Sequence, residues 1–191
     1  MFLLILGVVL WWVTHTFPLV ARPRRDALVA KMGEGPYKGI FALVSVGAIV
    51  LMTLGYQDAA WVTVWTPPSF TNHINNLLMV FAVALLGASH SKGNAKRFVR
   101  HPMLWAVVVW GVAHLLVKGH LAAVILFGGL AAWAVVAMFA TNARDGAWVK
   151  PAPAPIKKDF ILVGITLVVY VVISMVHLWL GVSPFPGAAA G

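Results

Sequence analysis

The chain contains no cysteine among its 191 residues. This absence excludes disulfide bonds, zinc–thiolate sites, iron–sulfur clusters and thiol nucleophiles. Histidine is the strongest side-chain metal ligand that remains, and the chain has seven histidines. Any transition metal held by the protein would therefore be bound mainly through imidazole.

Charged residues are also scarce, at 10% of the chain, whereas soluble domains average about 25%, and hydrophobic residues reach 61%. This composition indicates an integral membrane protein, whose first expected partner is the lipid bilayer. We expect an all-α, polytopic fold, a bundle of about six transmembrane helices forming a single domain over residues 1–182, followed by a flexible tail at 183–191. The expected spans, each about 17–25 mostly apolar residues long, are 2–21, 38–56, 74–91, 102–118, 121–141 and 160–181.

The basic residues indicate how the spans are oriented. Thirteen of the fourteen Lys and Arg residues fall in the loops 22–38, 92–100 and 144–158, and the remaining one is Lys118. The positive-inside rule predicts that these three loops are cytoplasmic and that both termini lie on the opposite side. The net charge of +9 thus reflects membrane orientation, and we expect no nucleic-acid partner.

The few acidic residues avoid the expected spans. All five, Asp26, Glu34, Asp58, Asp145 and Asp159, lie in loops or at span ends. Zinc and di-iron centres with open catalytic positions usually need carboxylates or several histidines. The distribution therefore argues against paired-carboxylate or di-metal chemistry inside the membrane.

Two histidines, His15 and His114, fall inside expected spans. His15 precedes Pro18 by three residues, and His114 lies about 18 Å from the start of its span on a rise of 1.5 Å per residue. An ionisable residue inside a membrane span indicates a functional site, although each histidine could instead be a hydrogen-bonded core residue. Two neutral imidazoles from different helices in an apolar bundle suit the axial positions of a haem iron.

Arg97, Arg100 and His101 gather at the inner end of the fourth expected span, just before Pro102. Arginines beside a helix N-terminus can bind an anion, such as a haem propionate, and the alternative is an ordinary basic membrane interface. His101 and His114 are about 20 Å apart along a straight helix, so they cannot both bind one metal. Depth along the helices does not decide which of them would pair with His15.

Five motifs stand out along the chain: GEGPYKGIFALVSVGAIVLMTLGY at 33–56, WTPP at 65–68, RHPMLW at 100–105, GVAHLL at 111–116 and ILFGGLAAWAV at 125–135. Together they resemble the NnrU family. The resemblance is strongest over residues 1–140 and implies a bacterial inner-membrane protein with periplasmic termini, associated with nitrite and nitric oxide reduction in denitrification. The family is similar to 15-cis-zeta-carotene isomerase, a haem b membrane enzyme. That similarity implies haem b with His15 and His114 as axial ligands and His101 as a functionally important neighbour.

The resemblance allows two functions. One is redox-gated cis–trans isomerisation of a hydrophobic polyene, and the other is a non-catalytic haem protein that passes electrons to nitrogen-oxide reductases or supports their assembly. The Arg100-His101-Pro102 motif also resembles S-adenosylmethionine-dependent membrane methyltransferases, but these use downstream glutamates and none follows Glu34 here. Where family members commonly have NGD after AHLL, this chain has Lys118-Gly119-His120, which could supply an extra ligand.

Overall fold

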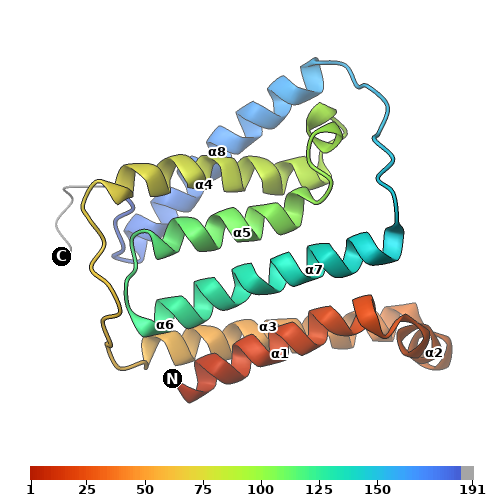
Figure 1. Ribbon diagram of the computed structural model, residues 1–191, viewed down its shortest axis with the longest axis horizontal. Helices are drawn as coiled ribbons and strands as arrows, with labels where there is room; N and C mark the ends of the chain where they lie inside the picture. Colours follow the sequence, from red (N-terminus) through yellow and green to blue (C-terminus); the bar gives the residue numbers. More distant parts are fainter. Residues whose placement is uncertain (186–191) are drawn as a thin grey trace.

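The computed structural model describes residues 1–185, which form a bundle of helices (Figure 1). Apart from an isolated bridge between Thr63 and His120, the secondary structure of these residues is helical. In chain order the elements are α1 (Phe2–Val20), α2 (Arg22–Met32), α3 (Glu34–Gln57), α4 (Thr71–His90), the 3₁₀ helix η1 (Asn94–Arg97), α5 (Pro102–Leu115), α6 (Leu121–Ala123), the π-helix η2 (Val124–Gly128), α7 (Gly129–Asp145) and α8 (Lys157–Trp179). Because α6, η2 and α7 follow without a break, they form one long helix, Leu121–Asp145.

Five helices are long and apolar enough to cross a membrane: α1, α3, α4, Leu121–Asp145 and α8. This confirms the prediction of an all-α, polytopic membrane protein. The expected span at 102–118 is shorter than predicted, because α5 has 14 residues and therefore a length of about 21 Å, less than the roughly 30 Å of a bilayer core. Figure 1 shows α5 inside the bundle, alongside α4 and α7.

The early end of α5 has a cause elsewhere in the chain. The backbone N–H groups of Val64 and Trp65 both donate hydrogen bonds to the carbonyl oxygen of Gly119, at 2.8 and 3.0 Å. A Cβ at Gly119 would collide with the carbonyl oxygen of Trp65. Gly119 and Leu121 are thus paired with the loop between α3 and α4, so the chain leaves the helix before it reaches them.

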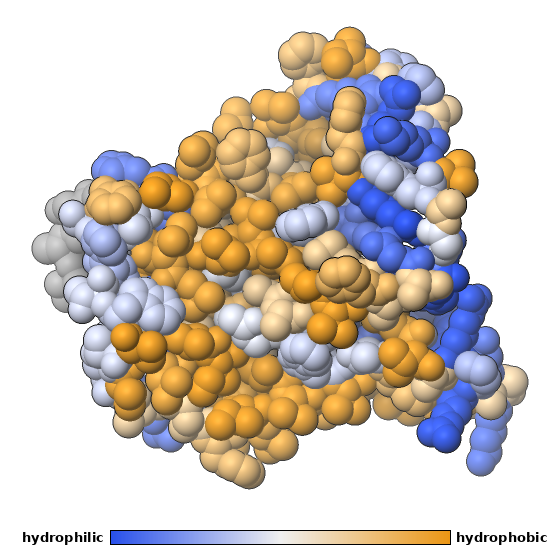
Figure 2. All heavy atoms as spheres, in the orientation of Figure 1, coloured by the Kyte–Doolittle hydropathy of each residue, from blue (hydrophilic) through white to orange (hydrophobic). Residues whose placement is uncertain are grey.

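Polar and apolar surfaces are segregated along the bundle. Figure 2 shows hydrophilic residues gathered at the end that carries α2 and the loops that precede α5 and α8, with hydrophobic residues covering the flank. The start of α1 and the end of α8 lie at the other end (Figure 1). Alternation of the spans therefore places the basic loops together, as the sequence predicts. Of the predicted tail at 183–191, residues 183–185 have no regular structure, and 186–191 lie outside the described residues.

Small residues let α1 and α3 pack closely. A Cβ at Gly7 would lie 2.7 Å from the backbone nitrogen of Met52, and a Cβ at Gly55 would overlap the backbone of Leu4. Leu4, Ala48 and Met52 are buried in this contact. Membrane helices associate through such small-residue contacts because lipid provides little hydrophobic drive between them.

We predict that Gly55→Val destabilises the protein, because its side chain has no space against Leu4. Overpacking a close contact costs about 1–3 kcal/mol or more, which would appear as a lower melting temperature in detergent. Gly47→Val is the matched control, since a Cβ at Gly47 meets nothing within 4 Å and the same residue is introduced into the same helix. Equal melting temperatures for the two variants would contradict the close packing of α1 on α3.

Candidate functional site

An apolar cavity of about 580 Å³ lies within the bundle and receives side chains from all of its membrane helices. Trp11 of α1 and Trp110 of α5 contribute aromatic walls, and Met52 of α3 is among the aliphatic residues that line it. Tyr56 and Gln57, at the end of α3, add polar atoms at one end. Small-molecule and cofactor sites commonly have this size and apolar character, so the cavity is the leading candidate site.

His15 contacts the cavity indirectly, through Trp11, which lines it. Its ring stacks on Trp11 with centroids 3.8 Å apart, and it meets Phe41 and Trp133 edge-on at 5.0 and 5.4 Å. Its Nδ1 is 3.0 Å from the carbonyl oxygen of Trp11. Because a carbonyl can only accept, the proton sits on Nδ1 and Nε2 keeps its lone pair, as in a histidine prepared to bind a metal.

His114 has the same arrangement at the end of α5. Its Nδ1–H donates to the carbonyl oxygen of Trp110 at 2.8 Å, and its ring stacks on Phe127 with centroids 4.5 Å apart. Trp110 lies 5.1 Å away and also lines the cavity. Since α5 ends at Leu115, His114 occupies the last turn of a short helix.

The structure places His15 and His114 in separate aromatic clusters. Trp133, the neighbour of His15, belongs to a buried cluster of α7 that packs against Val107 and Val108 of α5, whereas His114 packs against Phe127. Phe127 precedes Trp133 by six residues of one continuous helix, so the two levels differ by about 9 Å. Both clusters border the cavity, because Trp11 of the first and Trp110 of the second line it.

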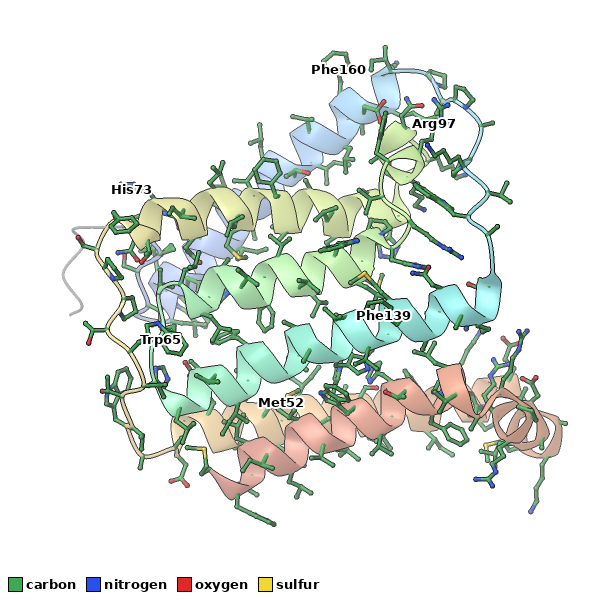
Figure 3. The ribbon with its side chains drawn as sticks, viewed as in Figure 1. Met52, Trp65, His73, Arg97, Phe139 and Phe160 are labelled. Carbon is green, nitrogen blue, oxygen red and sulfur yellow. The ribbon has the colours of Figure 1, made fainter. Side chains whose placement is uncertain are left out.

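Arg97, Arg100 and His101 lie at the basic end of the bundle. His101 is the N-cap of α5, and its Nε2 is 2.8 Å from the Oδ1 of Asn142 in α7. The Nε of Arg97 is buried and has no hydrogen-bond partner within residues 1–185. Figure 3 shows Arg97 at the opposite end of the molecule from Trp65 and His73. The structure thus separates this corner from His114.

Within residues 1–185, no three His, Cys, Asp or Glu side chains converge in a way that could hold a metal ion. Haem makes a smaller demand, because the porphyrin supplies four nitrogens and the protein only one or two axial ligands. Imidazoles with fixed Nδ1–H groups beside a large apolar cavity fit this requirement as donors. Because His15 and His114 lie in separate aromatic clusters, the binding of one iron by both is a proposal.

The NnrU protein family matches the chain over residues 3–184. The chain belongs to the NnrU family. The motifs lie within residues 1–140, but the match continues beyond them through α8. No curated protein and no solved structure matches the chain.

This NnrU-family chain also has two histidines whose surroundings its sequence does not reveal. His177 of α8 donates its Nδ1–H to the carbonyl oxygen of Ile173 at 2.8 Å, and Ile173 lines the cavity. His177 therefore shares the arrangement of His15 and His114. The sequence offers no signal for this, because a place near the end of a span equally suits a histidine at the membrane surface.

His120 lies outside the spans, at the end of the cavity marked by Tyr56. It is only 5% exposed, its ring stacks on Trp61 at 4.1 Å, and it lies 5.5 Å from the ring of Tyr56. Its Nδ1 has no partner within residues 1–185. Burial lowers the pKa of His120 below its ordinary value, and the charge of Lys118 lowers the pKa further.

We predict that His120 makes the protein less stable in mild acid. Because its folded pKa lies below the unfolded value of about 6.5, the unfolded state binds the proton more readily, and stability falls as the pH drops through about 6.5. His120→Gln should therefore show a smaller loss of melting temperature between pH 7.5 and 5.5 than the wild type. His73→Gln, at an exposed histidine, is the control, and an unchanged pH dependence in His120→Gln would contradict the prediction.

Proposed function

We propose that this NnrU-family membrane protein binds haem b at the central cavity and catalyses redox-gated cis–trans isomerisation of a hydrophobic polyene. The observation that carries the proposal is the apolar cavity of about 580 Å³ flanked by histidines whose Nδ1–H groups are held by backbone carbonyls. Each of these histidines offers Nε2 as its remaining ligand atom. An apolar wall with few polar groups also suits an extended hydrocarbon substrate.

His15 and His114 are the proposed axial ligands. Haem would supply an iron that changes valence and can exchange an axial ligand. Both imidazoles would have to bring Nε2 to one iron, although their aromatic neighbours Phe127 and Trp133 lie about 9 Å apart along the long helix. A histidine that did not bind the iron would keep its aromatic neighbour, Trp11 for His15 or Phe127 for His114.

Arg97, Arg100 and His101 are proposed to hold the carboxylates of the haem. Support comes from the buried Nε of Arg97, which lacks a partner within residues 1–185. His15 lies five residues before the end of α1, about 8 Å from the basic end. A carboxylate bound at this corner would thus be closer to the level of His15 than to that of His114.

The optical spectrum of the purified protein tests the cofactor. We expect the sharp reduced bands of six-coordinate haem b in the wild type, and their loss in His15→Ala and in His114→Ala. His73→Ala, which removes an exposed histidine, should keep them. A colourless protein that binds S-adenosylmethionine would overturn the proposal in favour of a methyltransferase.

Turnover of a cis-polyene under reducing conditions tests the reaction. The haem-loaded wild type should convert a cis-zeta-carotene to its trans isomer, and the oxidised protein should not. The His15→Ala and His114→Ala variants should lose this activity together with the six-coordinate spectrum. A haem-loaded protein without turnover would instead indicate an electron-transfer or accessory role in nitrogen-oxide reduction.

A further inference from the structure

A second groove, of about 380 Å³, lies between the end of α4 and the start of α8. It is distinct from the central cavity, with which it shares no lining residue among residues 1–185. His90 and Lys92 border it from α4 and the following loop, and Lys158 borders it from α8. The groove therefore opens at the basic end of the bundle, where the membrane spans meet the headgroup region.

The wall formed by α8 changes from charged to apolar along its length. Lys158, Ile161, Leu162 and Ile165 all line the groove, and their spacing of three, four and seven residues places them on one face of the helix. From Lys158 to Ile165 the helix rises about 10 Å. Ile161 and Ile165 are 51% and 54% exposed, so this apolar wall is open to lipid.

A hydrogen-bonded clamp holds the two sides of the groove together. Asp159 accepts from the backbone N–H of Asn94 at 2.7 Å and from the Nδ2 of Asn94 at 2.6 Å. Asn94 also exchanges two hydrogen bonds with the backbone of Ala154. The loop that carries Lys92 is thus fixed against the start of α8.

The clamp also holds the carboxylate of Asp159 against Asn94 rather than against a lysine. Asp159 is the carboxylate next to Lys158 in the chain, and both of its oxygens are occupied by Asn94. Lys92 and Lys158 form no ion pair with any residue in 1–185 and are exposed. Two free ammonium groups, with the imidazole of His90 beside them, attract an anion.

We propose that this groove binds an anionic phospholipid, with its phosphate against Lys92 and Lys158 and an acyl chain along Ile161 and Ile165. Basic pockets between membrane helices bind anionic headgroups in this way. A free phosphate would use the charged end alone, whereas a phospholipid also covers the exposed apolar wall. The site does not depend on haem or on the proposed reaction.

Titration of the purified full-length protein with phosphatidylglycerol or phosphatidylcholine in neutral detergent, followed by native mass spectrometry, tests the site. We expect phosphatidylglycerol to bind more tightly. The double variant Lys92→Gln/Lys158→Gln should weaken phosphatidylglycerol binding by about tenfold or more, given the usual effect of a basic residue near a membrane surface. Lys31→Gln/Lys150→Gln, which removes the same charge from the same end of the bundle, should bind like the wild type.

Three outcomes would overturn the proposal. They are equal weakening in both double variants, equal binding of phosphatidylcholine, and complete displacement of phosphatidylglycerol by inorganic phosphate, which would indicate a free-anion site. All four substituted lysines lie at the surface, and a melting curve of each variant checks that it is folded. Ile165→Ser should weaken binding of long-chain phosphatidylglycerol more than that of a short-chain form, which separates acyl-chain contact from charge.

Discussion

Every backbone N–H and C=O group inside a bilayer must find its partner within the protein, because hydrocarbon offers none. The backbone meets this requirement by forming helices. His15, His114 and His177 satisfy one ring nitrogen by a similar device, in which Nδ1–H donates to a backbone carbonyl four residues earlier. One helix turn can satisfy only one ring nitrogen, so Nε2 stays available. The constraint that builds the bundle thereby also leaves three imidazoles able to accept a ligand.

The long helix Leu121–Asp145 connects the two halves of the candidate site. On one side, Trp12 of α1 donates its Nε1–H to the carbonyl oxygen of Gly129 at 3.0 Å. On the other side, a Cβ at Gly111 of α5 would lie 2.7 Å from the carbonyl oxygen of Phe127. Both contacts fall at η2 or directly after it, and π-helical turns are frequent at functional sites. The helices that carry His15 and His114 are thus both held against one segment.

The sequence predicts the elements better than it predicts their surroundings. Composition and span length identify the membrane helices, and intramembrane position is enough to select His15 and His114. The early end of α5 escapes prediction, because it depends on Gly119 pairing with Val64 and Trp65 more than fifty residues away. The polar helix α2 is also missed by hydropathy, because it buries none of its residues and so shows no apolar face. The aromatic clusters around the histidines depend on helix packing, which no local pattern encodes.

The separation of these clusters limits what the site can hold. Phe127 and Trp133 belong to one rigid helix and keep the neighbours of His114 and His15 about 9 Å apart in level. Any single metal that binds both imidazoles, bare or held in a porphyrin, needs each Nε2 about 2 Å away. The cavity bounded by Trp11 and Trp110 is where both clusters meet, so a ligand that engages both must occupy it. A ligand that fills this cavity must itself be largely apolar, since few polar groups line the wall.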